Sequence, residues 1–253
     1  MKANIYIGAA GWSYTEWLGK FYPQDMNSQV FLSYYLRHFN TVEINSSFYH
    51  LPLRKTLRRW HDSTPPDFLF AVKASRFITH LKRLSEPQQS VQKFFEIITS
   101  LKKKTGPILF QLPPRWKSNP ERLSALMKVL PKQYRYTFEL RDPNWFNDDI
   151  YNILKEHNAA FCIYDFDKNM SPKIVSADFV YVRFHGPDRK YVGSYSDDFL
   201  KQWANDFQEW QRQGKDVYCY FDNTADGAAV KNAQYLKDFL STTSEASKFS
   251  LAV

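Results

Sequence analysis

Cysteine is scarce in this chain, and long apolar runs are missing. Two cysteines, Cys162 and Cys219, are too few for a disulfide framework. Both lie in apolar, strand-like runs, where a buried and inert thiol is the usual state. No segment approaches the ~20 apolar residues of a membrane helix, and residues Met1–Tyr6 lack the apolar stretch of a signal peptide. We therefore expect a cytoplasmic location, a reducing compartment and no membrane association.

Several motifs of well-known enzyme classes are also missing. The chain has no Walker motif, no Gly-x-Gly-x-x-Gly, no Gly-x-Ser-x-Gly, no Cys-x-x-Cys pair and no His-Glu-x-x-His. These absences disfavour P-loop nucleotide hydrolysis, Rossmann redox chemistry, α/β-hydrolase chemistry and the common zinc sites. No Gly/Ser-rich linker divides the chain either, which predicts a single domain over 1–253, with its core at about 5–240 and a polar, loose tail at 241–253.

Positive charge predominates in what is present. Lys and Arg number 34 against 26 Asp and Glu, which gives a formal net charge of +8. Such a surplus favours anionic partners, including nucleic acid and phosphorylated metabolites. The basic residues are dispersed, and the densest cluster, Lys102–Lys104, ends a predicted helix, where cations suit the helix dipole.

Eight short strand-like runs alternate with amphipathic segments along most of the chain. Only the connection at Asp167–Asp178 has weak helical character. Alternating strands and helices predict a parallel sheet, and eight repeats predict one α/β domain, a (β/α)8 TIM-type barrel with long loops at its C-terminal rim. The predicted strands are Ile5–Ala10, Thr41–Phe48, Phe68–Ser75, Pro107–Leu112, Tyr134–Arg141, Ala159–Phe166, Phe179–His185 and Val217–Asp222. The predicted helices are Gln29–Phe39, Arg54–Asp62, Pro87–Lys103, Glu121–Leu130, Asp148–Glu156, Asp198–Gln213 and Ala228–Leu240.

Polar and apolar residues alternate within several of these strands. In the second strand Glu43 and Asn45 oppose Val42 and Ile44. The fifth, seventh and eighth strands show the same pattern. Large apolar residues suit the outer face of a barrel, under its helices. The polar residues are therefore expected to point inward, toward the strand ends where barrel enzymes build their sites.

Short motifs spread along the chain resemble those of the YecE-like family, also called domain of unknown function 72. The resemblance runs from about Ile5 to Leu240 and implies a TIM-type barrel, with no particular activity. Each motif is weak alone, and together they are specific. They are Gly8–Tyr14, Tyr22–Pro23, Val42–Tyr49, Phe70–Lys73, Leu109–Pro114, Phe138–Arg141, Tyr181–Gly186 and Tyr220–Asn223.

The inward polar residues form the predicted site. Glu139 and Arg141 lie two residues apart on one strand, so a carboxylate and a guanidinium share one face. His185 ends a strand beside Gly186 and is a plausible general acid or base, whereas His50 and His80, in rim loops, are weaker candidates. We predict catalytic roles for Glu139, His185, Glu43 and Asp222, and substrate-binding roles for Arg141, Arg183, Lys73, Asn45, Gln111, Trp12, Trp145 and Asn223.

Several interpretations of this set remain open. The leading one is an enzyme that acts by general acid and base chemistry on a small anionic, phosphate- or carboxylate-bearing substrate, as a hydrolase, lyase or isomerase. A nucleic-acid-binding module could use the same cations with the aromatic rim. Paired carboxylates and aromatics are also found in glycoside hydrolases. Alternatively, the charges neutralise one another as a structural network.

No cofactor is expected, and the sequence gives no oligomeric state. A divalent metal is possible but not favoured, because only one inward histidine is available and Lys73, Arg141 and Arg183 already balance the carboxylates.

Overall fold

The computed structural model describes residues 3–250, which form two compact units. Unit 1 contains the residues up to Phe39, the segment Tyr164–Met170 and the residues from Val182 onward. Unit 2 contains Asn40–Ile163 and Ser171–Tyr181. The single domain stays a prediction.

Eight strands follow one another in a single order. Neighbouring strands pair in the sequence β1-β9-β8-β6-β5-β4-β3-β2, and the pairs β1/β9, β2/β3, β3/β4, β4/β5 and β5/β6 are parallel. Parallel strands joined mostly through helices confirm the predicted α/β fold of the TIM-type barrel class. The strands are β1 (Ile5–Ala9), β2 (Thr41–Ile44), β3 (Leu69–Lys73), β4 (Thr105–Gln111), β5 (Tyr136–Glu139), β6 (Ala160–Phe166), β8 (Phe179–Phe184) and β9 (Asp216–Phe221).

The predicted second strand is too long at its C-terminal end. β2 stops at Ile44 because Ser46–Tyr49 turn into the short helix α2. The Ser47 hydroxyl lies 3.0 Å from the carbonyl oxygen of Ile44 and 2.6 Å from that of Lys73, and this buried contact ties the turn to the end of β3. The C-terminal ends of β2 and β3 are thus joined by the Ser47 side chain as well as by backbone pairing.

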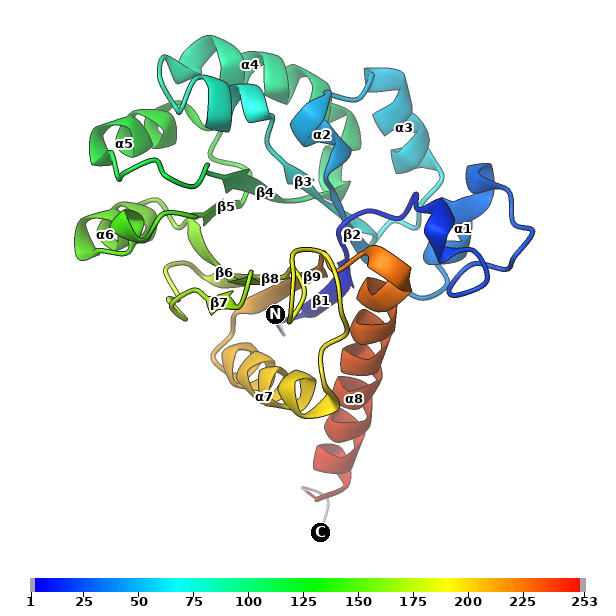
Figure 1. Cartoon of the computed structure of the whole chain (residues 1–253). Helices are drawn as coiled ribbons and strands as arrows, with labels where there is room; N and C mark the ends of the chain where they lie inside the picture. Colours follow the sequence, from blue (N-terminus) through cyan, green and yellow to red (C-terminus); the bar gives the residue numbers. More distant parts are fainter. Residues whose placement is uncertain (1–2, 251–253) are drawn as a thin grey trace. The chain divides into compact units, whose positions relative to one another are not determined.

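Four helices cover the strands of unit 2 on their outer side (Figure 1). They are α3 (Arg54–Asp62), α4 (Pro87–Ile98), α5 (Pro120–Val129) and α6 (Asp148–Glu156), and consecutive members pack on one another. Asn119 and Asn147 cap α5 and α6 through side-chain oxygens that accept from the backbone N–H of Arg122 and Ile150. Short helical segments η3 (Phe77–Leu81, one π-helical turn), η4 (Thr99–Lys104) and η5 (Pro143–Trp145) join these elements.

Unit 1 contains the longest helices, α7 (Asp197–Arg212) and α8 (Ala228–Ser250), which lie side by side (Figure 1). Helix α8 continues through the polar segment 241–250, and the last predicted tail residues, 251–253, lie outside the described residues. Among the helices and strands, the connection after β6 contains only the two-residue strand β7 (Asn169–Met170), in agreement with its weak helical pattern. Between β1 and β2, helix α1 (Phe31–Tyr35) follows the turns η1 (Thr15–Trp17) and η2 (Ser28–Val30).

Aromatic side chains fill much of the core of each unit. In unit 2, Phe110 stacks on Phe138 with ring centroids 5.2 Å apart, and both are fully buried. In unit 1, Tyr22 stacks on Phe31 at 4.1 Å. No helix within residues 3–250 combines the length and apolar character needed to cross a membrane.

Candidate functional site

Glu139 and Arg141 form the predicted pair at the C-terminal end of β5 in unit 2. Nε and Nη2 of Arg141 both donate to Oε1 of Glu139. The Glu139 side chain is fully buried and that of Arg141 is only 7% exposed. Gln111, at the end of β4, is the parallel register partner of Glu139. A buried pair of this kind is stable only while both partners are present.

Glu43, on β2, is bound by a side chain that was not among the predicted site residues. The hydroxyl of Tyr181 donates to its Oε2 at 2.6 Å, and both side chains are fully buried. A charge-assisted hydrogen bond of this length compensates part of the cost of burying the carboxylate. The sequence contained the signal, because Tyr181 occupies the polar face of its predicted strand.

Four positive charges act electrostatically on His80, which lies on η3. Burial, together with the positive charges of Lys73, Arg76, Arg141 and Arg83, lowers the pKa of His80 to about 4, so the ring is neutral at pH 7. We call these four residues the cation cluster. They come from the end of β3, from the turns on both sides of η3 and from the segment after β5.

Aromatic and hydroxyl groups hold His80 and Lys73 in place. Phe48 of α2 packs its ring edge-on to the His80 ring, with centroids 5.0 Å apart, and Lys73 Nζ lies 4.4 Å from the Phe48 centroid. Nδ1 of His80 is 2.9 Å from the Thr79 hydroxyl. Phe48 therefore packs against both a cation and the neutral imidazole.

Asn45 follows β2 directly and presents a buried acceptor. Its Oδ1 has no hydrogen-bond partner among the described residues. An unsatisfied buried carbonyl oxygen costs free energy, and such atoms are commonly paired by a water molecule or a ligand. Gln111 is less available, because its amide donates to the Leu112 carbonyl at 3.3 Å.

Arg183, His185 and Asp222 form a second cluster, in unit 1. Nη2 of Arg183 lies 2.9 Å from Oδ2 of Asp222, and its Nη1 lies 3.1 Å from Nε2 of His185. Because a guanidinium only donates, Nε2 accepts, and the ring proton of His185 sits on Nδ1. That atom is 3.0 Å from Oδ2 of Asp222, at an angle unsuited to a hydrogen bond.

This arrangement changes the part that His185 can play. The ring is buried, and both of its nitrogen atoms face protein groups. Its geometry suits a residue that orients Arg183 and Asp222, and the catalytic role of His185 stays a prediction.

Asp165, at the end of β6, fixes the loop that follows β8. Its Oδ2 accepts from the hydroxyl of Tyr195 at 2.8 Å, and the same hydroxyl accepts from the backbone N–H of Gly186 at 2.9 Å. Burial raises the pKa of Asp165, against the opposing effects of the Tyr195 hydrogen bond and of His185. Gly186 has φ +114°, and a Cβ there would lie 2.4 Å from the carbonyl oxygen of Val192. Only glycine fits this turn.

Asn223 supports the same loop. Its amide nitrogen donates to the carbonyl of Gly193 at 2.8 Å and to Oδ1 of Asn232, on α8, at 2.9 Å. The amide nitrogen predicted to bind substrate therefore holds the loop, while Oδ1 of Asn223 lacks a hydrogen-bond partner among the described residues.

The two tryptophans predicted to bind substrate are both buried. Trp145 is fully buried in η5, where its Nε1 donates to the Trp116 carbonyl at 2.6 Å and its ring packs against that of Trp116. The Asp142 side chain caps this turn, and the turn buries the ring. Trp12, in unit 1, is 9% exposed, and its carbonyl accepts from the Tyr22 hydroxyl.

The structure thus gathers the predicted residues into groups within each unit. In unit 2 it joins Glu139 to Arg141 and places Lys73 in the cation cluster. In unit 1 it joins Arg183, His185 and Asp222. One pocket shared by all of them stays a prediction. Sequence reasoning left Tyr195 and Asn232 out of the site, and their spacing from Asp165 and Asn223 along the chain carries no signal.

The carboxylates of these clusters form hydrogen bonds or ion pairs with protein side chains. Over residues 3–250, no three His, Cys, Asp or Glu side chains lie close enough to form a metal site. What the geometry offers instead is cationic side chains and polar acceptors at strand ends.

Comparison with known proteins now settles the family. The model of the family described as protein of unknown function DUF72 matches residues 6–251. The chain belongs to the DUF72 family. It is 27% identical over 269 residues to the UPF0759 protein YunF of Bacillus subtilis, covering 93% of this chain and 94% of that protein. It is 32% identical over 145 residues to the UPF0759 protein YecE of Escherichia coli K12, covering 56% of this chain and 50% of that protein.

Solved structures of DUF72 proteins share the fold. A DUF72 family protein from Thermotoga maritima superposes with a TM-score of 0.86 at 30% identity, covering 94% of this chain and 99% of that one. One from Enterococcus faecalis gives a TM-score of 0.77 at 20% identity, covering 94% and 95%. Membership in DUF72 thus establishes the fold, and the activity has to be argued from the side chains.

Proposed function

We propose that this DUF72 protein is an enzyme that binds a substrate bearing a phosphate or carboxylate group through unit 2 and acts on it by general acid and base catalysis. The observation that carries the proposal is that Lys73 ends β3, Arg141 follows β5, and both charges act on His80, with Phe48 packed against Lys73 and the His80 ring. In TIM-type barrels, active sites lie at this end of the strands.

The cations suit an anionic ligand. Arg141 offers a planar guanidinium, which matches the oxygen atoms of phosphate and carboxylate, and Lys73 adds a compact charge. His80 is neutral at pH 7, so it does not add to the repulsion among the four cations. A bound anion would relieve that repulsion, and this is the source of the binding free energy that we expect.

Proton transfer is assigned to Glu139, with His80 as a neutral hydrogen-bonding partner of the substrate. Glu139 is fixed by Arg141, so an anion that engages the guanidinium comes close to the carboxylate. Glu43, held by Tyr181, is proposed to orient the neighbouring polar groups. The acceptor of Asn45 is proposed to meet a donor of the substrate.

In unit 1, Arg183, His185 and Asp222 are proposed as positioning residues. Their polar atoms face one another, and Asp165 and Asn223 hold the adjoining loop.

A thermal-shift screen tests the proposal with inorganic phosphate, sugar phosphates, nucleotides, carboxylates, neutral sugars and short oligonucleotides. A ligand at ~100 times its dissociation constant adds about 2.7 kcal/mol to the free energy of unfolding, or roughly 5–10 °C in Tm for a chain of this size. We expect a small anion to give this shift, and we expect Arg141→Ala to lose it. The control is Arg212→Ala, which removes the same charge from an exposed position on α7.

The catalytic part is tested with the anion that binds. Glu139→Gln should retain binding of this anion and lose turnover. Turnover is measured by NMR spectra of the ligand. A shift that survives in both Arg141→Ala and Lys73→Ala, or no shift with any anion, would overturn the proposed site. A shift with oligonucleotides alone, falling steeply with salt, would support the nucleic-acid alternative instead.

A further inference from the structure

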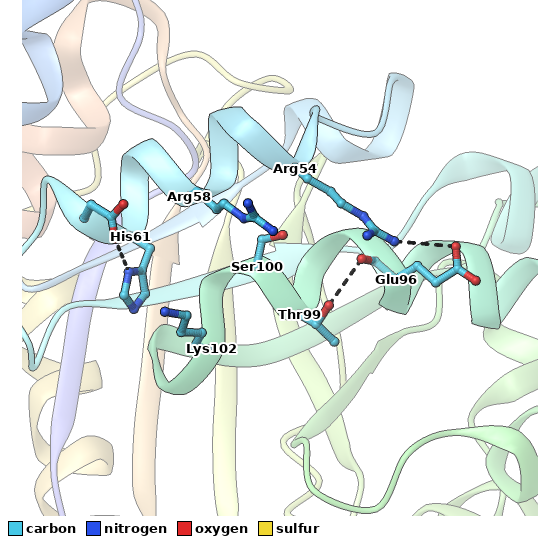
Figure 2. A pocket seen from close by; sticks show the side chains of 8 residues that line it. Arg54, Arg58, His61, Glu96, Thr99, Ser100 and Lys102 are labelled. Atoms are coloured by element: carbon cyan, nitrogen blue, oxygen red, sulfur yellow. Dashed lines mark hydrogen bonds and ion pairs between the residues drawn. The ribbon is translucent and has the colours of Figure 1, made fainter.

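A second concentration of positive charge lies on the outer side of unit 2, away from the strand ends. Helix α3 packs on η4, and between them is a cleft of about 400 Å³ (Figure 2). This volume lies in the range of small-molecule sites. We call it the outer cleft. It is lined by Arg54, Arg58, His61, Asp62, Glu96, Thr99, Ser100 and Lys102.

One face of α3 supplies the basic wall. Arg54, Arg58 and His61 follow the i, i+4, i+7 spacing, which puts them on one side of the helix. Like charges four residues apart repel each other and destabilise an isolated helix. Such a stripe therefore favours an anion in front of it.

The two acidic residues of the outer cleft are already engaged. Oδ1 of Asp62 lies 2.8 Å from Nδ1 of His61. Oε2 of Glu96 lies 3.7 Å from Nη2 of Arg54 (Figure 2). Arg58 and Lys102 have no hydrogen bond or ion pair to any described residue. Arg58 thus remains without an ion-pair partner among the described residues, while the positive charge of Lys102 acts on Asp62 and helps to lower the pKa of that carboxyl group.

The opposite wall, η4, adds hydroxyl groups and a strained lysine. Ser100 lies half-buried there, and Figure 2 shows Arg58 reaching from α3 toward this wall. Lys102 has φ 50° and ψ −127°, a backbone conformation that costs a non-glycine residue of order 1–3 kcal/mol. Glycine would adopt it without that cost.

A neighbouring lysine keeps the cleft in shape. The buried Lys104 Nζ donates to the carbonyl of Thr64 at 2.6 Å and also to the carbonyl of His61, which joins η4 to the end of α3. The two walls are therefore fixed before any ligand arrives.

We infer that the outer cleft is a binding site for the phosphate group of a small phosphorylated ligand. Arg58 supplies the guanidinium, Lys102 the ammonium group and Ser100 a hydroxyl, the three kinds of donor that phosphate oxygens accept. No Phe, Tyr or Trp of residues 3–250 lines the cleft, and the His61 ring is held by Asp62, so recognition rests on the phosphate and not on stacking of a base. The inference stands apart from the proposed function, since it uses none of its residues.

Inorganic phosphate and pyrophosphate are the probes, with binding followed by amide chemical shifts in NMR titrations of the full chain. We expect Ser100 and Lys102 to shift and saturate, with a dissociation constant of about 1 mM or below. Arg58→Ala and Lys102→Ala should each weaken this binding at least about tenfold. Arg212→Ala, with the same loss of charge on α7, should leave it unchanged.

A glycine substitution separates binding from stability. Lys102→Gly should lose phosphate affinity as Lys102→Ala does, while its Tm is equal to or above that of the parent chain because the strained conformation suits glycine. Unchanged binding in Arg58→Ala and Lys102→Ala would overturn the inference. So would a cleft that responds only to RNA or to other polyanions.

Discussion

Unit 1 and unit 2 each bring charged side chains to the carboxyl ends of their strands, but they balance that charge differently. In unit 1, Arg183 contacts both Asp222 and His185. In unit 2, Glu139 balances Arg141, while the other members of the cation cluster gather around a neutral imidazole. The first arrangement is closed by contacts among its own members, and the second is the one that we propose to bind an anion. Burial of polar residues does not by itself distinguish the two.

Breaking the network of unit 1 should have the largest effect on stability. Arg183→Met leaves the Asp222 carboxylate without its guanidinium, and removal of one partner of a buried ion pair costs about 3–5 kcal/mol. Urea denaturation measures this loss. Arg212→Met, which removes an exposed ion pair with Glu209, should cost less than about 1 kcal/mol. Equal losses in the free energy of unfolding would contradict the prediction that the buried network of unit 1 stabilises the protein more than an exposed ion pair does.

The pH dependence of stability should sharpen the description of unit 2. His80 has an ordinary pKa of 6.5 when unfolded and about 4 when folded, so the unfolded chain binds more protons between these values. The free energy of unfolding should therefore fall as the pH drops from about 6.5 to 4. We expect a contribution of about 1 kcal/mol, because the ring is partly exposed.

The variant His80→Gln cannot titrate and serves as the reference for this measurement. Urea denaturation at pH 7 and pH 5 should show a smaller loss in His80→Gln than in the parent chain. In an NMR titration, Lys73→Ala should raise the pKa of His80 only in part, because burial is the largest cause of the shift. Identical pH dependence in parent and variant would mean that the imidazole is not held neutral.

The smallest effect is expected at Asn45. Its Oδ1 has no hydrogen-bond partner and its side chain does not cap α2, so Asn45→Ala should change the free energy of unfolding by no more than about 0.5 kcal/mol. The same variant should weaken the binding of the anionic ligand to unit 2. A loss of 2 kcal/mol or more in the absence of ligand would show that the amide is structural.

The fold could be predicted because its signals are local. Short strand-like runs located all eight strands, and 3.6-residue periodicity gave α3 and α6 with the bounds that the structure has. The error at Thr41–Phe48 arose because Phe48 continues the apolar pattern of β2 after the chain has turned into α2. The family motifs, quoted on the same residues, agree with the DUF72 match over residues 6–251.

The site was harder to predict, because alternation gives the face of a side chain and not its partner. Glu139 and Arg141 could be paired from their spacing, since they lie two residues apart. Glu43 could not be assigned to Tyr181, which is 138 residues away in the chain. The burial of Trp145 could not be predicted either, because its ring packs on Trp116, which is 29 residues away in the chain.

Gly186 shows what these contacts mean for the gene that encodes the chain. The carbonyl oxygens of Val192 and Arg189 lie within 2.6 Å of where a Cβ would stand, and the backbone N–H of Gly186 is held by Tyr195. Any first- or second-base change of a glycine codon adds a side chain or a stop, whereas any third-base change leaves glycine. Codon 186 should therefore drift only by synonymous substitution.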